Sequence, residues 1–218
     1  MIKVDNLSKS FPLVDGKVTI LDSLSLHIPE KSTAAILGKS GSGKSTLLSI
    51  LAGLDRPDQG EIIMGGSSLL SLNDDELTLF RARQMGIVFQ QFHLMSSLTA
   101  LENVMIPLEI LKIENAKQRA IDLLEQVGLG HRIHHYPSQL SGGESQRVAL
   151  ARAIIHRPKV IFADEPSGNL DEETGVMVMN LLFDLVQKEG LTLVLVTHDE
   201  ELAKRCSKTF RLHLGKML

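Results

Sequence analysis

The stretch STAAILGKSGSGKST, residues 32–46, decides the fold of this chain. It starts as a compact apolar run, passes through glycines and continues into the helix-forming run STLLSILAGL. Gly38, Gly43, Lys44 and Ser45 satisfy the spacing G-x-x-x-x-G-K-S, which joins a buried strand to a helix in phosphate-binding proteins. A plain Gly/Ser turn that caps a helix is the alternative, but it accounts for neither the lysine at this offset nor the flanks. The sequence therefore predicts a strand, a phosphate-binding loop and a helix.

The residues of this loop have separate roles in holding a nucleotide. Glycines let backbone N–H groups converge on phosphate oxygens, and the helix N-terminus adds a favourable dipole. Lys44 is expected to reach the β- and γ-phosphates, and the Ser45 hydroxyl to ligate Mg²⁺. The predicted nucleotide-binding residues of the loop are Gly38, Lys39, Ser40, Gly41, Ser42, Gly43, Lys44, Ser45 and Thr46.

Length and composition limit the class of protein. The chain has 218 residues, a net charge of -3 and 43% apolar residues, which suits one packed unit with a subsidiary lobe. Its apolar runs are shorter than the ~20 residues of a membrane-spanning helix, and its N-terminus shows no secretory signal. The single cysteine, Cys206, fits a reducing compartment. We therefore expect a cytoplasmic protein. Because the net charge is mildly negative and no dense Lys/Arg run is present, we expect no nucleic-acid partner.

Hydrophobic periodicity predicts a core of parallel strands, together with antiparallel strands near the N-terminus and a helical segment in the middle of the chain. Period-two alternation before residue 32, with a turn at Asp15-Gly16, predicts antiparallel strands. After the strand GIVFQ, a helical signal runs from residue 98 to about 156, with a capping-box spacing at Thr99 and Glu102. The apolar, β-branched runs VIFA and LTLVLVT are typical of buried parallel strands. We therefore expect an α/β protein whose parallel core is interrupted by a helical insertion.

Polar residues stand where the predicted parallel strands end. VIFA runs into Asp164 and Glu165, GIVFQ ends in Gln90, and LTLVLVT is followed by His198. Ligands bind beyond the carboxyl ends of strands in open parallel sheets, so we expect these residues beside the phosphate loop. Asp164 is assigned to Mg²⁺ and Glu165 to polarising the attacking water. Gln90 is assigned to Mg²⁺ or that water, and His198 to the γ-phosphate. Taken singly, none is specific, because core strands often meet solvent at a polar residue.

A second glycine-rich helix start is LSGGE, residues 140–144. Ser141 is a natural N-cap, but Gly142 and Gly143 weaken a helix start unless a ligand or another backbone approaches. An ordinary capped helix therefore explains the serine and leaves the two glycines unexplained. The helix is expected to be amphipathic. Its predicted apolar face carries Val148, Ala151, Ile154 and Ile155, with Arg147, Arg152 and His156 elsewhere.

In order and spacing, these motifs resemble the nucleotide-binding domains of ATP-binding cassette (ABC) transporters. GKSGSGKST, Gln90, LSGGE, VIFADE, the SGNLD run and His198 carry the resemblance, which covers the whole chain. ADEPSGNLD, LSILAGLD and LTALENV are most similar to the branch that contains LolD, MacB and YbbA, and within it to YbbA-like proteins. The resemblance implies a P-loop NTPase (RecA-like) parallel-sheet core with an N-terminal antiparallel β-subdomain and an inserted α-helical subdomain. Residues 1–218 would form one domain, with the helical subdomain at approximately residues 91–157.

The resemblance also implies a homodimer that buries two ATP molecules, with Mg²⁺, between its subunits. Ser141 and Gly143 of one subunit would bind the γ-phosphate held by the loop of the other, within a nucleotide-contacting set that includes Gly142 and Glu144. Asp171, in the SGNLD run, would communicate across that interface. Glu144 replaces the usual glutamine of this motif, and we expect little effect on the ATPase.

Phe11 matches the position of an aromatic ring that stacks on adenine, and a core phenylalanine is the alternative. The family usually has tyrosine there. Stacking on phenylalanine carries little base specificity, so acceptance of GTP stays open. The catalytic set implied by the resemblance is Lys44, Gln90, Glu165 and His198.

The implied function is that of an ATPase subunit on the cytoplasmic face of a bacterial inner membrane. It would drive a separately encoded permease of the MacB/LolCDE type, for lipoprotein release or efflux of hydrophobic or peptide cargo, with a periplasmic partner reached through the permease. The apolar residues 92–107 would receive a permease helix, unless they are only the core of the helical lobe. The alternative function is a regulatory ATPase that switches a periplasmic enzyme. An ABC ATPase acting on ribosomes or DNA ranks last, because such chains usually carry two cassettes or a long coiled coil.

Overall fold

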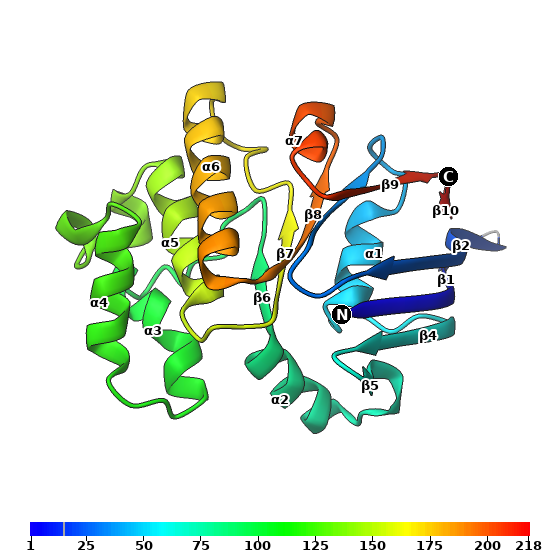
Figure 1. The fold of residues 1–218 in the computed structure, drawn as a ribbon, viewed down its shortest axis with the longest axis horizontal. Helices are drawn as coiled ribbons and strands as arrows, with labels where there is room; N and C mark the ends of the chain where they lie inside the picture. The colour runs from blue at the N-terminus through cyan, green and yellow to red at the C-terminus, as the bar shows by residue number, and fades with distance from the viewer. Residues whose placement is uncertain (15) are drawn as a thin grey trace. The chain divides into compact units, whose positions relative to one another are not determined.

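The computed structural model describes residues 1–14 and 16–218, so the turn predicted at Asp15 falls outside the described residues. The chain divides into two compact units. The first unit comprises Met1–Arg81 and Thr192–Leu218, and the second comprises Ala82–Leu191. Figure 1 labels most of the helices and strands of both.

The first unit contains an antiparallel sheet with the strand order β2-β1-β4-β5. Its strands are β1 (Ile2–Leu13), β2 (Gly16–Ile28), β4 (Gln59–Met64) and β5 (Ser67–Ser68). Ile2 pairs with Ile28 on one side and with Met64 on the other. All three side chains are fully buried, because alternate residues of each strand face the core. The predicted antiparallel strands are confirmed.

The same unit contains parallel strands, one of which leads into the phosphate loop. β3 (Thr33–Leu37) lies between β8 (Thr192–Thr197) and β9 (Lys208–His213) and is parallel to both, and β10 (Lys216–Met217) pairs antiparallel with β9. Every residue of β8 is buried, as its largely apolar, β-branched sequence TLVLVT predicts. The helical elements of this unit are α1 (Lys44–Leu51), η1 (Leu69–Ser71), α2 (Asp74–Gln84), which runs on into the second unit, and α7 (Glu200–Lys204).

The second unit pairs two parallel strands with a group of helices. β6 (Met85–Val88) is parallel to β7 (Val160–Asp164), with Val88 opposite Ala163. The helical elements are α3 (Ala100–Ile110), α4 (Ala116–Gln126), η2 (Gly130–Arg132), η3 (Pro137–Gln139), α5 (Gly142–Ile154) and α6 (Glu172–Glu189). The capping box predicted before α3 is confirmed, since the Thr99 N–H donates to Glu102 Oε2 at 2.7 Å and the Glu102 N–H donates to Thr99 Oγ1 at 3.3 Å.

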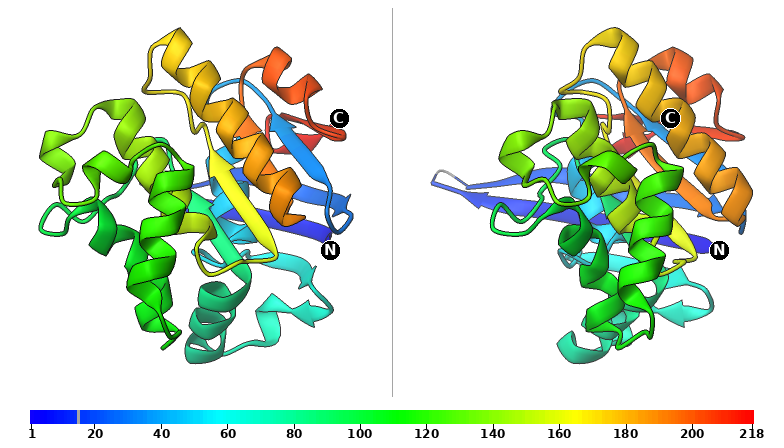
Figure 2. Two further views of the ribbon diagram at one scale, coloured as in Figure 1. Left: turned by 60° about the vertical axis from the view of Figure 1, so that its left-hand side comes forward. Right: turned by 90° about the vertical axis from the view of Figure 1, so that its left-hand side faces the viewer.

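Helix α5 is the centre of the second unit (Figure 2). It packs against α3, α4, α6 and β6, and Gln146, Val148, Ala149, Leu150 and Ala151 are all fully buried. The amphipathic helix predicted here is therefore wrong in one respect: α5 is buried nearly all round along its middle. The reason is tertiary, because neighbouring elements cover α5 on several sides and its small alanines let them approach closely.

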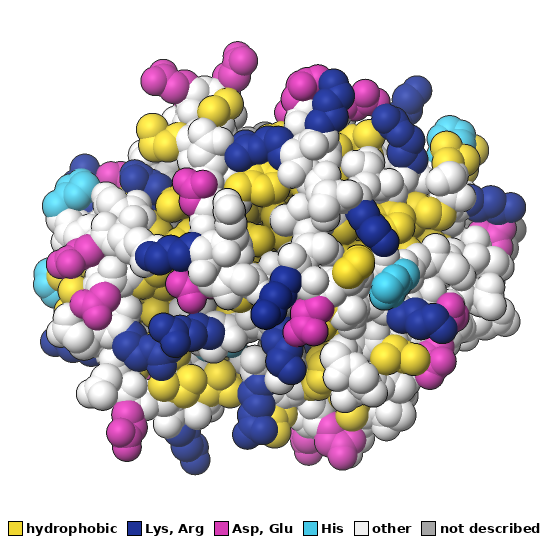
Figure 3. Space-filling view, viewed as in Figure 1, with side chains coloured by type: hydrophobic (Ala, Val, Ile, Leu, Met, Phe, Trp, Pro, Cys, Tyr) yellow, Lys and Arg dark blue, Asp and Glu magenta, His cyan; other side chains and the backbone are white. Residues whose placement is uncertain are grey.

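The surface carries charges of both signs. On the face drawn in Figure 3, acidic and basic side chains are interspersed, in keeping with the net charge of -3. Among the described residues, 1–14 and 16–218, no helix combines the length and the apolar character needed to cross a bilayer.

Candidate functional site

The phosphate-binding loop joins β3 to α1 in the first unit. Gly43, the residue before α1, has φ of 100°, a left-handed conformation in which glycine alone is free of strain. Lys44 is only 6% exposed, and its Nζ donates to the carbonyl oxygens of Gly38 at 2.9 Å and Lys39 at 3.1 Å. The loop therefore curls around the ammonium group, and it places a positive charge at the N-terminus of α1.

The inner surface of this loop fits a phosphate group. The Ser42 Oγ atom is buried, and no residue among 1–14 and 16–218 forms a hydrogen bond with it. A Cβ atom built on Gly41 would meet nothing within 4 Å, so open space adjoins the loop there. An orphaned hydroxyl, a buried ammonium group and a helix N-terminus together form the donor set that anions bind.

The β1–β2 hairpin lies against this loop and carries Phe11. A Cβ atom on Gly43 would come within 3.0 Å of the Ile20 carbonyl oxygen, so the loop touches β2 directly. Phe11 pairs with Val18 in the hairpin, is 39% exposed, and has the Lys9 Nζ atom 5.1 Å from its ring centroid. The alternative of a core phenylalanine is therefore wrong, and the ring is accessible for stacking.

His198 is also placed beside the loop in the first unit. Strands β3 and β8 are parallel, with Leu37 opposite Thr197, so Gly38 and His198 follow at the same edge. His198 is exposed there. The structure thus places His198 beside the phosphate loop, at the strand edge where the sequence predicted it.

In the second unit, Gln90 contacts the turn that follows Glu165, beyond the carboxyl ends of β6 and β7. The Gln90 Nε2 atom donates to Asn169 Oδ1 at 3.1 Å, and Asn169 Nδ2 donates to the Gln90 carbonyl oxygen at 3.1 Å. The Gly168 N–H donates to the Glu165 carbonyl oxygen at 2.9 Å, which closes the turn after β7. Glu165 has φ of 42°, which is uncommon for a residue with a side chain and typical of functional turns.

Asn169 was missed by the sequence reasoning. Its reciprocal amide contact with Gln90 depends on the folded positions of two distant loops. The only sequence signal was its place in the SGNLD run, which pointed to Asp171 instead.

The LSGGE motif forms the N-terminus of α5, where Ser141 and Gly142 are exposed and Gly143 is buried. Ser141 Oγ accepts the Glu144 N–H at 3.2 Å, and Glu144 Oε2 accepts the Ser141 N–H at 2.8 Å. The Arg132 Nε atom donates to Glu144 Oε1 at 2.9 Å. The backbone hydrogen bond from Ser141, with a smaller contribution from Arg132, holds the pKa of Glu144 below its ordinary value. Glutamate therefore fulfils the capping role that glutamine would have at this position.

Packing within the subunit explains why the second glycine of this motif, Gly143, is a glycine. A Cβ atom on Gly143 would lie 2.4 Å from Thr174 Cγ2, at the first turn of α6. Asp171 is the N-cap of α6, its Oδ1 accepts the Thr174 N–H at 3.0 Å, and this bond lowers its pKa. Close packing between α5 and α6 thus requires a glycine here, independently of any ligand.

The predicted site residues are divided between the two units. The first unit holds Phe11, residues 38–46 and His198, and the second holds Gln90, Ser141, Gly142, Gly143, Glu144, Asp164, Glu165 and Asp171. The Ser45 hydroxyl and the Asp164 carboxylate are the oxygen ligands that Mg²⁺ prefers. Because they belong to different units, their convergence on one ion stays a prediction.

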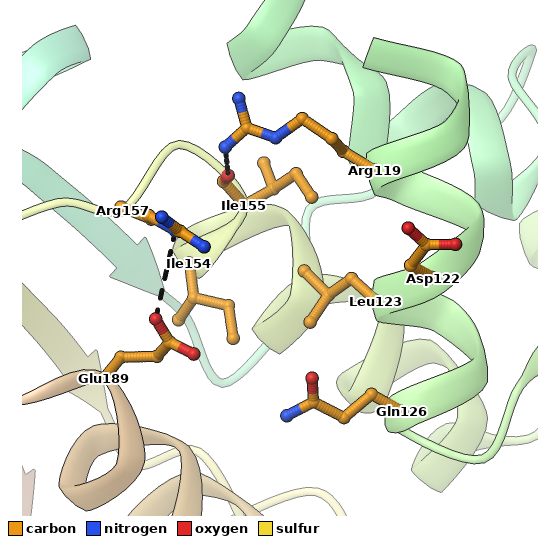
Figure 4. A pocket seen from close by; sticks show the side chains of 8 residues that line it. All are labelled: Arg119, Asp122, Leu123, Gln126, Ile154, Ile155, Arg157 and Glu189. Carbon is orange, nitrogen blue, oxygen red and sulfur yellow. Dashed lines mark hydrogen bonds and ion pairs between the residues drawn. The ribbon is translucent and has the colours of Figure 1, made fainter. Parts of the chain in front are cut away.

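A pocket of about 180 Å³ lies elsewhere in the second unit, between α4, the end of α5 and the end of α6 (Figure 4). Arg119 Nη2 donates to the Ile155 carbonyl oxygen at 3.1 Å. The Arg157 Nε atom lies 4.0 Å from Glu189 Oε2. The pocket contains none of the predicted site residues, and both of its arginines have protein partners.

Comparison with known proteins shows which family this chain resembles. The family profile described as "ABC transporter" matches residues 21–168. The chain is 49% identical, over 213 residues and 97% of both chains, to the lipoprotein-releasing system ATP-binding protein LolD of Bdellovibrio bacteriovorus. It is 47% identical to the uncharacterised ABC transporter ATP-binding protein YbbA of Escherichia coli, over 100% of this chain and 96% of the relative.

A solved structure shows the same similarity. The dimeric post-hydrolysis state of the ATP-binding cassette MJ0796, bound to ADP and Pi, has a TM-score of 0.91 and 40% identity. The match covers 100% of this chain and 96% of that chain.

Proposed function

The chain belongs to the ABC transporter family, as one of its ATP-binding cassettes, and from that premise we propose that it works as a homodimer with two composite ATP sites and drives a separately encoded permease. The chain is an ATPase that uses ATP and Mg²⁺, and its α/β P-loop NTPase fold is that of solved cassettes. The predicted branch is confirmed, because both LolD and YbbA proteins are among its relatives.

The observation that carries the homodimer proposal is the second anion-binding helix start. Ser141 and Gly142 are exposed at the N-terminus of a long helix whose remaining length is largely buried. The phosphate loop in the first unit already supplies one such helix terminus. Two helix termini suit one triphosphate that is enclosed from two sides, and the dimeric relative bound to ADP and Pi supports two subunits as the source.

We assign the chemistry to residues of both units. The loop and Lys44 hold the β- and γ-phosphates, and Ser45, Gln90 and Asp164 would hold Mg²⁺, which supplies charge neutralisation on phosphate oxygens when bound. Glu165 orients a water molecule and accepts its proton as the oxygen attacks the γ-phosphorus. The bond to the β,γ-bridging oxygen breaks, and ADP and phosphate are the products.

The remaining roles at the site concern the γ-phosphate, the subunit interface and the adenine base. His198 donates a hydrogen bond to the γ-phosphate, and Ser141 and Gly143 of the partner copy cover its other side. Asp171 transmits the nucleotide state across the interface. Phe11 stacks on the adenine ring.

The permease is proposed to be of the MacB/LolCDE type, with the chain bound at the cytoplasmic face of an inner membrane. The similarity to LolD supports lipoprotein or other hydrophobic cargo. Residues 92–107 would contact the permease, and the exposed Met95 suits an adaptable apolar contact. Copurification of the chain with its permease, followed by identification of the permease, tests this assignment. Recovery of a membrane protein of another class would overturn it.

The substitution Glu165→Gln tests the dimer. We expect it to bind Mg-ATP, to lower kcat by a factor on the order of 10² or more, and to accumulate as a dimer in size-exclusion chromatography. The carboxamide keeps the shape of the side chain but cannot accept the proton. Lys44→Ala is the control, and it should lose nucleotide binding and therefore fail to accumulate as an ATP-bound, closed dimer. A Glu165→Gln variant that stays monomeric with ATP bound, even with its permease, would refute the composite site.

A further inference from the structure

The segment that follows Gln90 has an unusual backbone. Phe92 has φ of 37° and His93 has φ of 46°, so two consecutive residues with large side chains adopt the left-handed conformation. This conformation is uncommon for such residues and persists only where surrounding contacts maintain it. Phe92 and His93 follow Gln90 closely in the chain, so the contacts that maintain their left-handed conformation also help to fix the position of Gln90.

Arg152 of α5 provides two of those contacts. Its Nη1 atom donates to the His93 carbonyl oxygen at 2.6 Å, and its Nη2 atom donates to the Phe92 carbonyl oxygen at 2.8 Å. Burial of the guanidinium lowers the pKa of Arg152, although the group stays charged at neutral pH because its ordinary pKa is so high. The fork of the guanidinium matches two neighbouring carbonyl groups, which is a geometry that lysine lacks.

Gln146, on the same helix, makes a similar contact on the other side of Gln90. Gln146 is fully buried, and its Nε2 atom donates to the Pro166 carbonyl oxygen at 2.7 Å and lies 3.5 Å from the Phe89 carbonyl oxygen. Phe89 precedes Gln90, and Pro166 follows Glu165. A carboxamide nitrogen carries two hydrogens, so this one group can serve a carbonyl in each loop.

We propose that Gln146 and Arg152 are positioning residues for ATP hydrolysis. They hold the Gln90 segment on both sides and tie it, with the turn that carries Glu165, to the helix that begins at Ser141. The placement of Gln90 and Glu165 is then set by α5, the helix that also presents the LSGGE motif. This inference rests on the roles proposed above for Gln90 and Glu165.

A purely structural role makes a different prediction. If these two side chains only stabilise the fold, their loss lowers Tm, while kcat measured well below Tm is unchanged. If they position Gln90 and Glu165, kcat falls while the KM for ATP is preserved, because the phosphate loop of residues 38–46 is untouched. Small displacements of reacting groups are costly in rate, so the two outcomes are well separated.

The test uses Gln146→Met and Arg152→Met in the full chain, which remove the donors and keep the side chains long. We expect kcat to fall by about tenfold or more in each, with KM for ATP within about twofold. Gln118→Met is the matched surface control, since Gln118 is exposed and donates to Asp122 on its own helix. Leu124→Ala is the stability control, because Leu124 is fully buried in the same unit and its loss lowers Tm.

The outcomes separate this inference from the proposed function. Unchanged kcat in both Met variants, or a loss of kcat no greater than that of Leu124→Ala at equal distance below Tm, would overturn the positioning role. If Arg152→Met does not fold, Arg152→Lys replaces it, and it should still show reduced kcat at unchanged KM. Full turnover by Glu165→Gln would instead refute the assignment of Glu165, whatever the Met variants do.

Discussion

Glu144 completes the capping box at the start of α5, whose N-cap is Ser141, and its charge is part of that role. Its two oxygens accept hydrogen bonds from the Ser141 N–H and the Arg132 side chain, and its pKa is lowered as a result. A negative charge is also favourable next to the positive end of a helix dipole. The substitution of glutamate for the usual glutamine therefore keeps the capping box and adds an ion pair.

We expect Glu144→Gln to retain ATPase activity within about twofold, because the carboxamide oxygen still accepts the Ser141 N–H. The loss of the ion pair should lower the free energy of unfolding at pH 7. Because the folded pKa is lowered, the contribution of the charged group is present above the unfolded pKa and is lost as pH falls through the folded pKa. Urea unfolding of both proteins at pH 7 and at pH 4 and below checks this. A difference that stayed constant with pH would contradict the assignment.

At the scale of elements, the sequence predicted the strands and loops that have local signals. The G-x-x-x-x-G-K-S spacing predicted β3, the loop and α1, and the Thr99 capping box predicted the start of α3. The deep burial of α5 and the contact between Gln90 and Asn169 were not predictable in this way. Both depend on elements far apart in the chain, and periodicity within one segment does not report such contacts.

The contact between α5 and α6 is the element-scale feature with the clearest test. Gly143→Ala places a methyl group 2.4 Å from Thr174 Cγ2, a distance too short for two carbon atoms, so one of the two helices or the Thr174 side chain must move. We expect a loss of about 1–3 kcal/mol in the free energy of unfolding, together with reduced ATPase activity. Thr174→Ser removes the opposing methyl group, so the double variant should regain stability in urea unfolding.

The activity of the double variant separates two reasons for this glycine. Recovery of both stability and ATPase would mean that close packing alone requires Gly143. Recovery of stability without ATPase would mean that the bound phosphate also needs the bare backbone. Failure of the double variant to regain stability would contradict the steric explanation.

At the scale of the whole molecule, the proposed homodimer makes each active site depend on two copies of the chain. The loop with Lys44 and the motif with Ser141 would then come from different subunits, so defects in the two can complement each other. Lys44→Ala removes the phosphate contact. Ser141→Asp keeps a good N-cap for α5 and sets a negative charge against the phosphate.

Each of these variants should be inactive alone, since both sites of its homodimer are defective. In an equal mixture, half of the dimers are mixed, and each mixed dimer has one intact site and one doubly defective site. We therefore expect recovery of roughly a quarter of wild-type ATPase activity, if subunits exchange freely and sites act independently.

Phosphate release is measured before and after mixing, with Lys44→Ala plus Glu165→Gln as the control pair. In that pair, the intact Glu165 comes from the subunit that lacks Lys44, so each site keeps a defect and no activity should return. Absence of recovery in the test pair, with mixed dimers demonstrated by tag copurification, would mean that Lys44 and Ser141 do not serve one site from two subunits.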